Sequence, residues 1–404
     1  MNPNSVNGSL PVAGSNLLDT PGGGYVAVEY VFIQFAGFTF GKSSSAFATP
    51  WNGYPGNNTS NLLGGHDTVT GVNNIQYTAQ FGNGVSATIG LDDPTVFDRT
   101  QVANLTVPLT SQGAVANAYG GTHAPDIVGN IRIDQAWGLW QISAAGHDVN
   151  ASYNTLNTLG PPPGAVGLPG AAPTNLSEIS GHPSDKWGWA VSTAFQIKNI
   201  PLGPGDDFKI DATYTKGDLK QVISTSATSP NPFTMFGGAS NPGSYQSIGF
   251  GAVSDAVYAP AGLGGPLAGA DGNLHLTSAW GVRGAYNHNW DPYWSSSLFG
   301  GYAQVHYDNT AKFFICSTFV AARLPGVSSD FSCNPDFNVA MVGLVTRWTP
   351  VTNLTFSAEV LYFNLDQKFT GSATFTPTAP KPIAQYDFKD QNTVALNVRV
   401  QRNF

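Results

Sequence analysis

The strongest constraint on this chain is an alternation of apolar and polar residues, which recurs in segments of about ten residues. In residues 280–290, Trp280, Val282 and Tyr286 alternate with smaller or polar residues, and residues 207–215 repeat the pattern. Because successive side chains of a strand point to opposite faces, each segment would have one apolar face and one polar face. The alternation therefore predicts β-strands, joined into a sheet whose two faces differ in polarity.

The connections between these segments come in two lengths. Short turns, such as residues 82–84, 290–293 and 348–353, alternate with long loops rich in Gly, Pro, Ser, Asn and Thr, at residues 44–73, 93–125, 149–185, 218–276, 308–335 and 369–391. A transmembrane barrel has this asymmetry, with short periplasmic turns and long extracellular loops. We therefore expect an all-β fold, a transmembrane antiparallel β-barrel with about 13 strands present. Its single domain would cover residues 25–404, after an irregular segment at residues 1–24.

Composition favours an outer face in contact with lipid. Only 10% of the residues are charged, whereas about 25% is usual for soluble domains, which turn their charges to solvent. Aromatic residues gather at strand ends, as in the two interfacial girdles of a barrel; examples are Trp187, Trp189, Phe208, Trp290 and Trp348. A formal net charge of −8 argues against nucleic acid as a partner, because that role needs a basic surface. A soluble or surface-exposed all-β binding protein is the alternative class.

Three segments resemble one known family. Residues 30–44 (YVFIQFAGFTFGKSS), 77–91 (YTAQFGNGVSATIGL) and 398–404 (VRVQRNF) are similar to the alphaproteobacterial outer-membrane porin family. The resemblance implies a homotrimeric porin in outer-membrane lipid, through which small hydrophilic solutes and ions diffuse passively without a cofactor. It also implies that Phe404, which ends the closing strand, is the signal for barrel assembly. A substrate-specific outer-membrane channel is the nearer alternative.

The strand count departs from the family pattern. The family resemblance implies sixteen strands, and single-chain bacterial barrels have an even number. If the first three strands and a signal peptide precede this chain, it is either a fragment or a sequence with a misassigned start. The resemblance then assigns residues 45–73 to the loop that folds into the lumen and narrows it.

Charged side chains on the polar face are the candidates for selectivity, because charged rings in a narrow zone select ions. Arg132 and Arg283 lie mid-strand, where the pore should be narrowest, and are the strongest candidates. A basic wall opposite an acidic loop would orient dipolar solutes, and the net charge favours cations weakly. The predicted pore-lining residues are Lys42, whose phase depends on the turn at residues 36–37, Asp67, Arg132, Asp134, Lys209, Asp211, Arg283, Glu359 and Arg399, with Lys198 in the same phase.

Cysteine and histidine usage gives no catalytic motif. Cys316 and Cys333 lie 17 positions apart in one long loop; a disulfide that staples this loop is the favoured interpretation, and two free thiols are the alternative. No metal site or cofactor is expected. The adjacent His-Asp pairs at residues 66–67 and 147–148 would point to opposite faces of a strand and could not form a catalytic relay. A hydrolase that uses His288 as its base is the remaining enzymatic alternative.

Overall fold

The structure is a computed structural model of the whole chain. It describes residues 30–51, 53–58, 62–66, 71–95, 99–109, 117–151, 182–223, 233–238, 243–377 and 380–403. The predicted irregular segment at residues 1–24 lies outside these ranges, as do Asp67 and Phe404.

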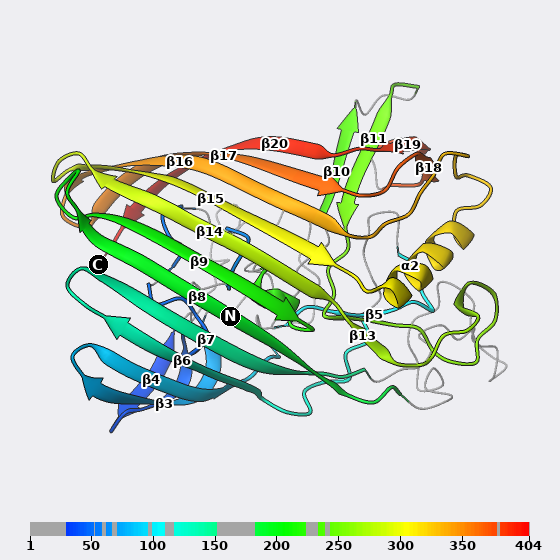
Figure 1. Cartoon of the computed structure of the whole chain (residues 1–404). Coiled ribbons are helices and arrows are strands. Elements are labelled where there is room, and N and C mark those ends of the chain that lie inside the picture. Colours follow the sequence, from blue (N-terminus) through cyan, green and yellow to red (C-terminus); the bar gives the residue numbers. More distant parts are fainter. Residues whose placement is uncertain are drawn as a thin grey trace, which may run out of the picture.

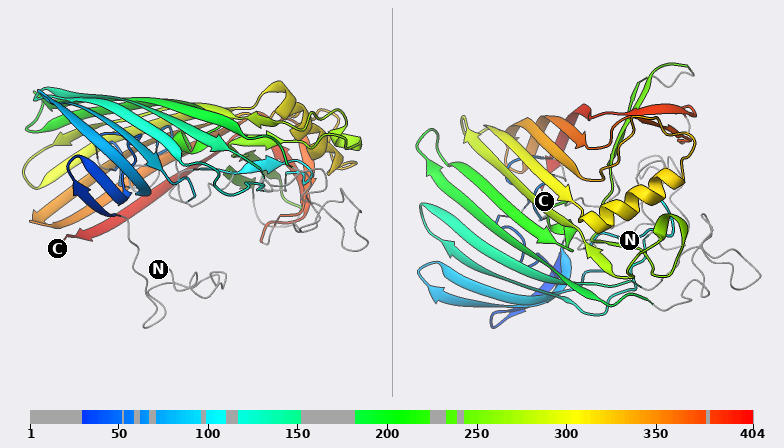
Figure 2. Two further views of the ribbon diagram at one scale, coloured as in Figure 1. Left: turned by 90° about the horizontal axis from the view of Figure 1, so that it is seen from below. Right: turned by 45° about the vertical axis from the view of Figure 1, so that its right-hand side comes forward.

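The described chain is built around one 13-stranded antiparallel sheet, which confirms the predicted fold class and strand count. Each strand is hydrogen-bonded to the next strand of the sheet, and β1 and β20 form its two edges. In sheet order, the strands are β1 (Val31–Phe35), β2 (Phe38–Ser43), β3 (Val72–Gly82), β4 (Val85–Asp92), β6 (Asp126–Asp134), β7 (Gly138–Val149), β8 (Lys186–Ile200), β9 (Asp206–Lys216), β14 (Ser278–Asn289), β15 (Trp294–His306), β16 (Phe337–Val351), β17 (Leu354–Gln367) and β20 (Gln391–Arg402). Figures 1 and 2 show these strands curving into a tilted wall.

Tight turns join the strands at one end of this wall, close to the predicted positions. At the first turn, Ala36 and Gly37 both have positive φ, 52° and 86°, a conformation that favours glycine. The last turn was predicted to start at Trp348, but β16 continues through an irregularity to Val351. The turn therefore shortens to Thr352 and Asn353, and Asn353 has a φ of 66°.

The outer face of the wall is apolar and exposed, as the alternation predicts. Ile75, Ile89 and Ile131 are 53%, 63% and 51% exposed, which is unusual for a soluble protein. Aromatic pairs lie near both ends of the strands: Trp189 with Tyr214 and Trp280 with Tyr302 at the long-loop end, and Trp294 with Trp348 at the short-turn end. This arrangement fits two interfacial girdles around a lipid-facing band.

The long loops are more structured than the sequence indicates. They form a cap at one end of the wall, made of a four-stranded sheet, a three-stranded sheet and one helix (Figure 1). The elements are β5 (Val102–Asn104), η1 (Leu219–Gln221), β10 (Phe233–Gly238), β11 (Gln246–Gly251), β12 (Ala256–Tyr258), η2 (Gly265–Leu267), β13 (Leu274–Leu276), α2 (Asn309–Ala321), β18 (Ser372–Phe375) and β19 (Ala384–Phe388). A large apolar cluster, which includes Phe250, Phe319 and Phe388, holds the cap together.

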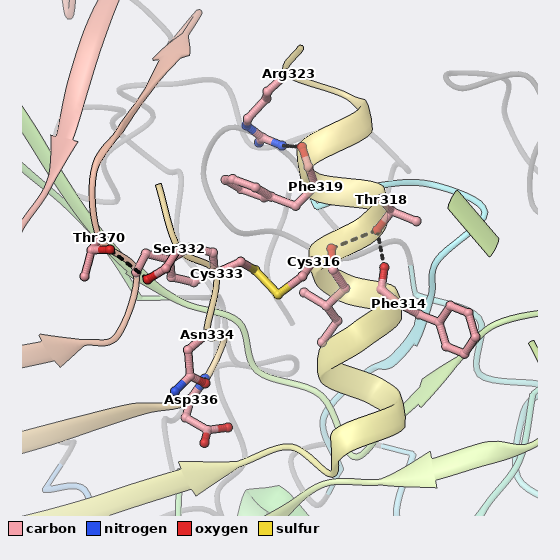
Figure 3. Close-up of a disulfide and its surroundings, with 12 residues drawn as sticks. Phe314, Cys316, Thr318, Phe319, Arg323, Ser332, Cys333, Asn334, Asp336 and Thr370 are labelled. Atoms are coloured by element: carbon pink, nitrogen blue, oxygen red, sulfur yellow. Dashed lines mark hydrogen bonds between the residues drawn. A yellow bond between two sulfur atoms is a disulfide. The ribbon is translucent and has the colours of Figure 1, made fainter. Parts of the chain in front are cut away.

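Residues 308–335 were predicted to form an irregular loop, but the structure has helix α2 at Asn309–Ala321. Asp308 caps its first turn by accepting a hydrogen bond from the Ala311 amide at 2.7 Å. The predicted disulfide is formed: it joins Cys316 on α2 to Cys333, with the two Cα atoms 5.7 Å apart (Figure 3). No helix among the described residues is long and apolar enough to cross a membrane.

We expect the double substitution Cys316→Ser and Cys333→Ser to loosen the cap while leaving the wall intact. Closing a loop of this length contributes about 3 kcal/mol on chain-entropy grounds. Limited proteolysis should therefore cut residues 309–333 faster in the variant than in the native protein. Reducing agent should reproduce the effect in the native protein and change nothing in the variant; equal cleavage rates in all four samples would contradict the prediction.

Candidate functional site

The candidate site is the segment between β2 and β3, which we call the inner loop, with described residues 45–51, 53–58 and 62–66. At its start it is bonded to β6 and β7. Asn130 Nδ2 donates to the Ala46 carbonyl at 2.6 Å, and Gln141 Nε2 donates to the Ala48 carbonyl at 2.7 Å. Both donors belong to the polar phase of their strands, so the inner loop packs on the polar face of the wall.

Further along, the inner loop contacts strands β16 and β17, which lie towards the other edge of the sheet. The Arg347 guanidinium donates to the Gly56 carbonyl at 2.5 Å and to Asn58 Oδ1 at 3.1 Å. The Asn58 amide donates to Glu359 Oε2 at 2.5 Å. Because β8, β9, β14 and β15 lie between β7 and β16 in the sheet, the loop crosses the concave side of the wall. In Figure 1 it is the blue trace behind the strands.

A buried ion pair fixes the middle of this crossing. Arg283 Nε lies 3.0 Å from Asp211 Oδ2, and both side chains are fully buried. The other guanidinium nitrogens donate to the inner loop: Nη1 to the Leu62 carbonyl at 3.1 Å and Nη2 to the His66 carbonyl at 2.6 Å. Gly65 permits this approach, because a Cβ there would collide with Asp211 and Arg283. Arg283 was predicted to line the pore, but the structure uses it to hold the loop.

Apart from Glu359, which is fully buried, the remaining predicted charges that the structure describes are more accessible. Asp134 Oδ2 accepts from Arg132 at 2.8 Å, and its Oδ1 accepts from Lys198 at 2.5 Å. Lys209 pairs with Asp207 at 3.1 Å. The side chains in these two groups are between 15% and 38% exposed. Together they form a strip of paired charges, partly accessible to water, near the short-turn end of the polar face.

Arg399 and Lys42, two predicted pore-lining residues near the edges of the sheet, lie on different faces of the wall. Arg399 on β20 pairs with Ser357, on the face of Glu359 and Arg347, and is exposed. Lys42 pairs with Asn73, whereas its neighbour Gly41 pairs with Asn74 and Thr39 pairs with Gln76. Since Gln76 belongs to the polar face, the register corrects the expectation for Lys42: it shares the outer face with Phe38 and Phe40.

The sequence prediction missed Arg347. Its pattern contained the signal, because Val345 and Arg347 alternate with Thr346 and Trp348 along β16. The turn predicted to start at Trp348 left Arg347 at the very end of the strand, whereas β16 continues to Val351. The structure places Arg347 opposite Ser295 and Ser357, on the polar face.

A polar groove lies between the start of the inner loop and strands β3, β4, β6 and β7. It consists of two adjoining parts of about 330 and 180 Å³, which share Thr78, Thr88, Asn130, Arg132 and Gln141. From the loop, Ser44, Ser45, Ala46, Ala48, Thr49 and Pro50 complete its lining. In this groove the described part of the inner loop and the wall together leave room for a small solute.

Two histidine sites lie away from the groove, one near the cap and one near the short-turn end of the wall. His123, Asp148 and Asp185 bring possible metal-ligand atoms within 4.8 Å of one another, and the 2.7 Å hydrogen bond between His123 and Asp185 accounts for that geometry without an ion. His288, the base of the hydrolase alternative, is hydrogen-bonded to Asp206 at 2.6 Å near the short-turn end.

Within the cap, His275 ties strand β13 to the start of α2 and makes this contact pH-dependent. The Asp308 carboxylate, 3.0 Å away, raises the pKa of His275 above its usual 6.5, against burial and with help from Asp271. Hydrogen bonds from Asn273 and His275 outweigh burial and lower the pKa of Asp271 to about 2. The tie should therefore be fully present between about pH 4 and 6.5, and be lost as the pH rises through the raised pKa of His275.

We expect the cap to resist proteolysis better at pH 6 than at pH 8.5, by an amount that corresponds to about 1 kcal/mol or less. His275→Gln should remove most of this difference, because it removes the titrating group. His182→Gln is the matched control, since the ring of His182 bonds to the Pro183 carbonyl and not to a carboxylate. Retention of the full pH difference in His275→Gln would contradict the assignment.

Comparison with known proteins identifies the family of this chain. The model of a porin subfamily matches residues 4–397. Among solved structures, the outer-membrane channel DcaP of Acinetobacter baumannii is 15% identical, with 91% of this chain and 73% of that chain covered and a TM-score of 0.48. OmpT, an outer-membrane protein of Vibrio cholerae, is 8% identical, with 90% and 75% covered and a TM-score of 0.42. No curated protein sequence matches the chain.

Proposed function

We propose that this chain, which belongs to the porin subfamily and lies in the outer membrane, forms a passive, water-filled channel for small hydrophilic solutes and ions. The observation that carries the proposal is the inner loop, bonded across the polar face by Arg283 and Arg347. A polar face is unfavourable in contact with lipid, whereas inside a barrel it borders the aqueous lumen. A loop held across that lumen narrows it, and so sets an upper limit on the size of the solutes that pass.

The finer parts of the proposal extend the family assignment. We infer a general diffusion porin of the alphaproteobacterial, sixteen-stranded type that works as a homotrimer and carries out no chemical reaction. The charge-paired strip of Arg132, Asp134 and Lys198 supports general diffusion, because paired charges discriminate weakly among solutes. Residues 45–73 would act as the constriction, with the described part of the inner loop supplying its contacts to the wall. In this arrangement Arg399 on β20 and Lys209 on β9 border the passage, whereas Glu359 is buried under the inner loop, where it accepts from the Asn58 amide.

Liposome swelling tests the function. The full chain, reconstituted in vesicles, should admit neutral sugars at rates that fall steeply from a pentose to a trisaccharide, because the inner loop limits the pore width. Protein-free vesicles are the control for leakage. Vesicles that stay impermeable to the pentose, from protein that is monodisperse without detergent, would instead support a soluble all-β binding protein.

A further inference from the structure

We propose that the polar groove is a binding subsite for a small, neutral, polyhydroxylated solute of the size of a monosaccharide. This inference rests on the proposed channel and names the class of solute that would pause in it. The groove has the chemistry of such a site in three respects: its hydrogen-bonding groups, two polar atoms without a partner, and the pairing of its charges.

The lining of the groove consists mainly of hydroxyl and amide groups. Its volume, about 330 Å³ for the larger part, is at the lower end of the range for small-molecule pockets. Hydroxyls and amides can each donate and accept hydrogen bonds, as sugar hydroxyls do. The polar lining residues without charge are Ser44, Ser45, Thr49, Gln76, Thr78, Gln80, Ser86, Thr88, Asn130 and Gln141.

Two of these groups are buried and unpaired. Among the described residues, Thr49 Oγ1 and Gln76 Oε1 have no hydrogen-bond partner, and Thr49 is only 8% exposed. Buried polar atoms are nearly always hydrogen-bonded, and leaving one unpaired is costly. A solute hydroxyl can donate to the Gln76 carbonyl oxygen and can both donate to and accept from the Thr49 hydroxyl. The two atoms lie on opposite sides of the groove, one on the loop and one on β3.

The charges at the groove favour a neutral solute over an ion. The Arg132 guanidinium is already paired with Asp134 at 2.8 Å, and Asp134 also accepts from Lys198. An anion would have to compete with this carboxylate, and a cation would meet two basic side chains. On the loop side, Ala46, Ala48 and Pro50 provide a small apolar surface, which suits the C–H face of a pyranose ring.

The test is single-channel recording of the full chain in a planar bilayer, with glucose as the probe. Glucose should produce brief, concentration-dependent interruptions of the current. Thr49→Val should weaken the apparent affinity about fivefold to tenfold, as expected for one lost hydrogen bond. This change keeps the shape of the side chain and breaks no protein hydrogen bond, because Thr49 Oγ1 has none among the described residues. Thr346→Val is the control: it makes the same change on the outer face of β16, where it removes only the hydrogen bond with Ser296, and should leave the interruptions unchanged.

The possible outcomes separate the two proposals. Conductance steps without any effect of glucose would overturn the subsite and leave the channel standing. Interruptions by gluconate, which has the same hydroxyl pattern plus a carboxylate, but not by glucose would overturn the neutral class in favour of an anion site. The absence of conductance steps in salt alone would overturn the channel itself.

Discussion

Replacing Arg283 with methionine is expected to destabilise the protein by about 3 to 5 kcal/mol and to release the inner loop. The substitution leaves Asp211 as an unpaired charge in a fully buried site and removes the donors to the Leu62 and His66 carbonyls. Denaturant unfolding in detergent measures the stability. Single-channel recording should show a larger and noisier conductance, because the loop no longer holds its position across the lumen.

The double variant Arg283→Met and Asp211→Leu separates the two effects. Removing both charges removes the unpaired carboxylate, so most of the stability should return. The loop still lacks its guanidinium donors, so the altered conductance should persist. If the double variant were as unstable as the single variant, or if the single variant kept native stability and conductance, the assigned role of Arg283 would be wrong.

The second large effect is expected at Asp255, a fully buried carboxylate that joins three segments of the cap. Its Oδ2 accepts from the Thr100 amide at 2.8 Å and from the Tyr119 hydroxyl at 3.0 Å, and its Oδ1 accepts from the Leu219 amide at 2.6 Å. Asp255→Leu leaves the buried amides of Thr100 and Leu219 without an acceptor, each at a cost of about 1 to 3 kcal/mol. The Tyr119 hydroxyl keeps its contact with His147 Nε2 at 2.8 Å. We expect a loss of at least about 2 kcal/mol in cap stability, since such costs are not fully additive.

Hydrogen exchange checks this prediction residue by residue. The amides of Thr100 and Leu219 should lose their protection in Asp255→Leu, while amides of the wall, such as those of β16, should keep theirs. The exposed carboxylate Asp291 provides the control variant Asp291→Leu, which should leave the cap unchanged. Unaltered protection at Thr100 and Leu219 would show that the cap does not depend on this carboxylate.

The wall could be predicted from the sequence because its signal is local. Each strand carries its own alternation, and several short turns have residues with positive φ, such as Gly37, Asn83 and Asn353. The cap could not be predicted from the sequence, because some of its short strands pair with distant partners. For example, β12 pairs in parallel with β5, which lies about 150 residues earlier in the chain. Its segments are flanked by glycine and proline, so they look like loops until their pairing is known.

The candidate site shows the same division between local and distant signals. Strand phase placed Arg132, Asp134, Lys209, Asp211, Arg283, Glu359 and Arg399 on one face. The partners of Arg283 in the loop are backbone carbonyls more than 200 positions away, and no sequence pattern records such a contact. The error at Lys42 has a local cause: a two-residue turn at Ala36 and Gly37 changes the phase of the next strand.

Cysteine accessibility in a conducting channel tests the central claim, that the polar face under the inner loop borders a water-filled passage. Both native cysteines are joined in the disulfide, so an introduced thiol is the sole reactive one. Thr88→Cys places it in the groove and Thr346→Cys places it on the outer face. We predict that a charged thiol reagent lowers the single-channel current of Thr88→Cys stepwise and leaves that of Thr346→Cys unchanged. A current insensitive to modification at position 88, with the thiol shown to have reacted, would contradict the account.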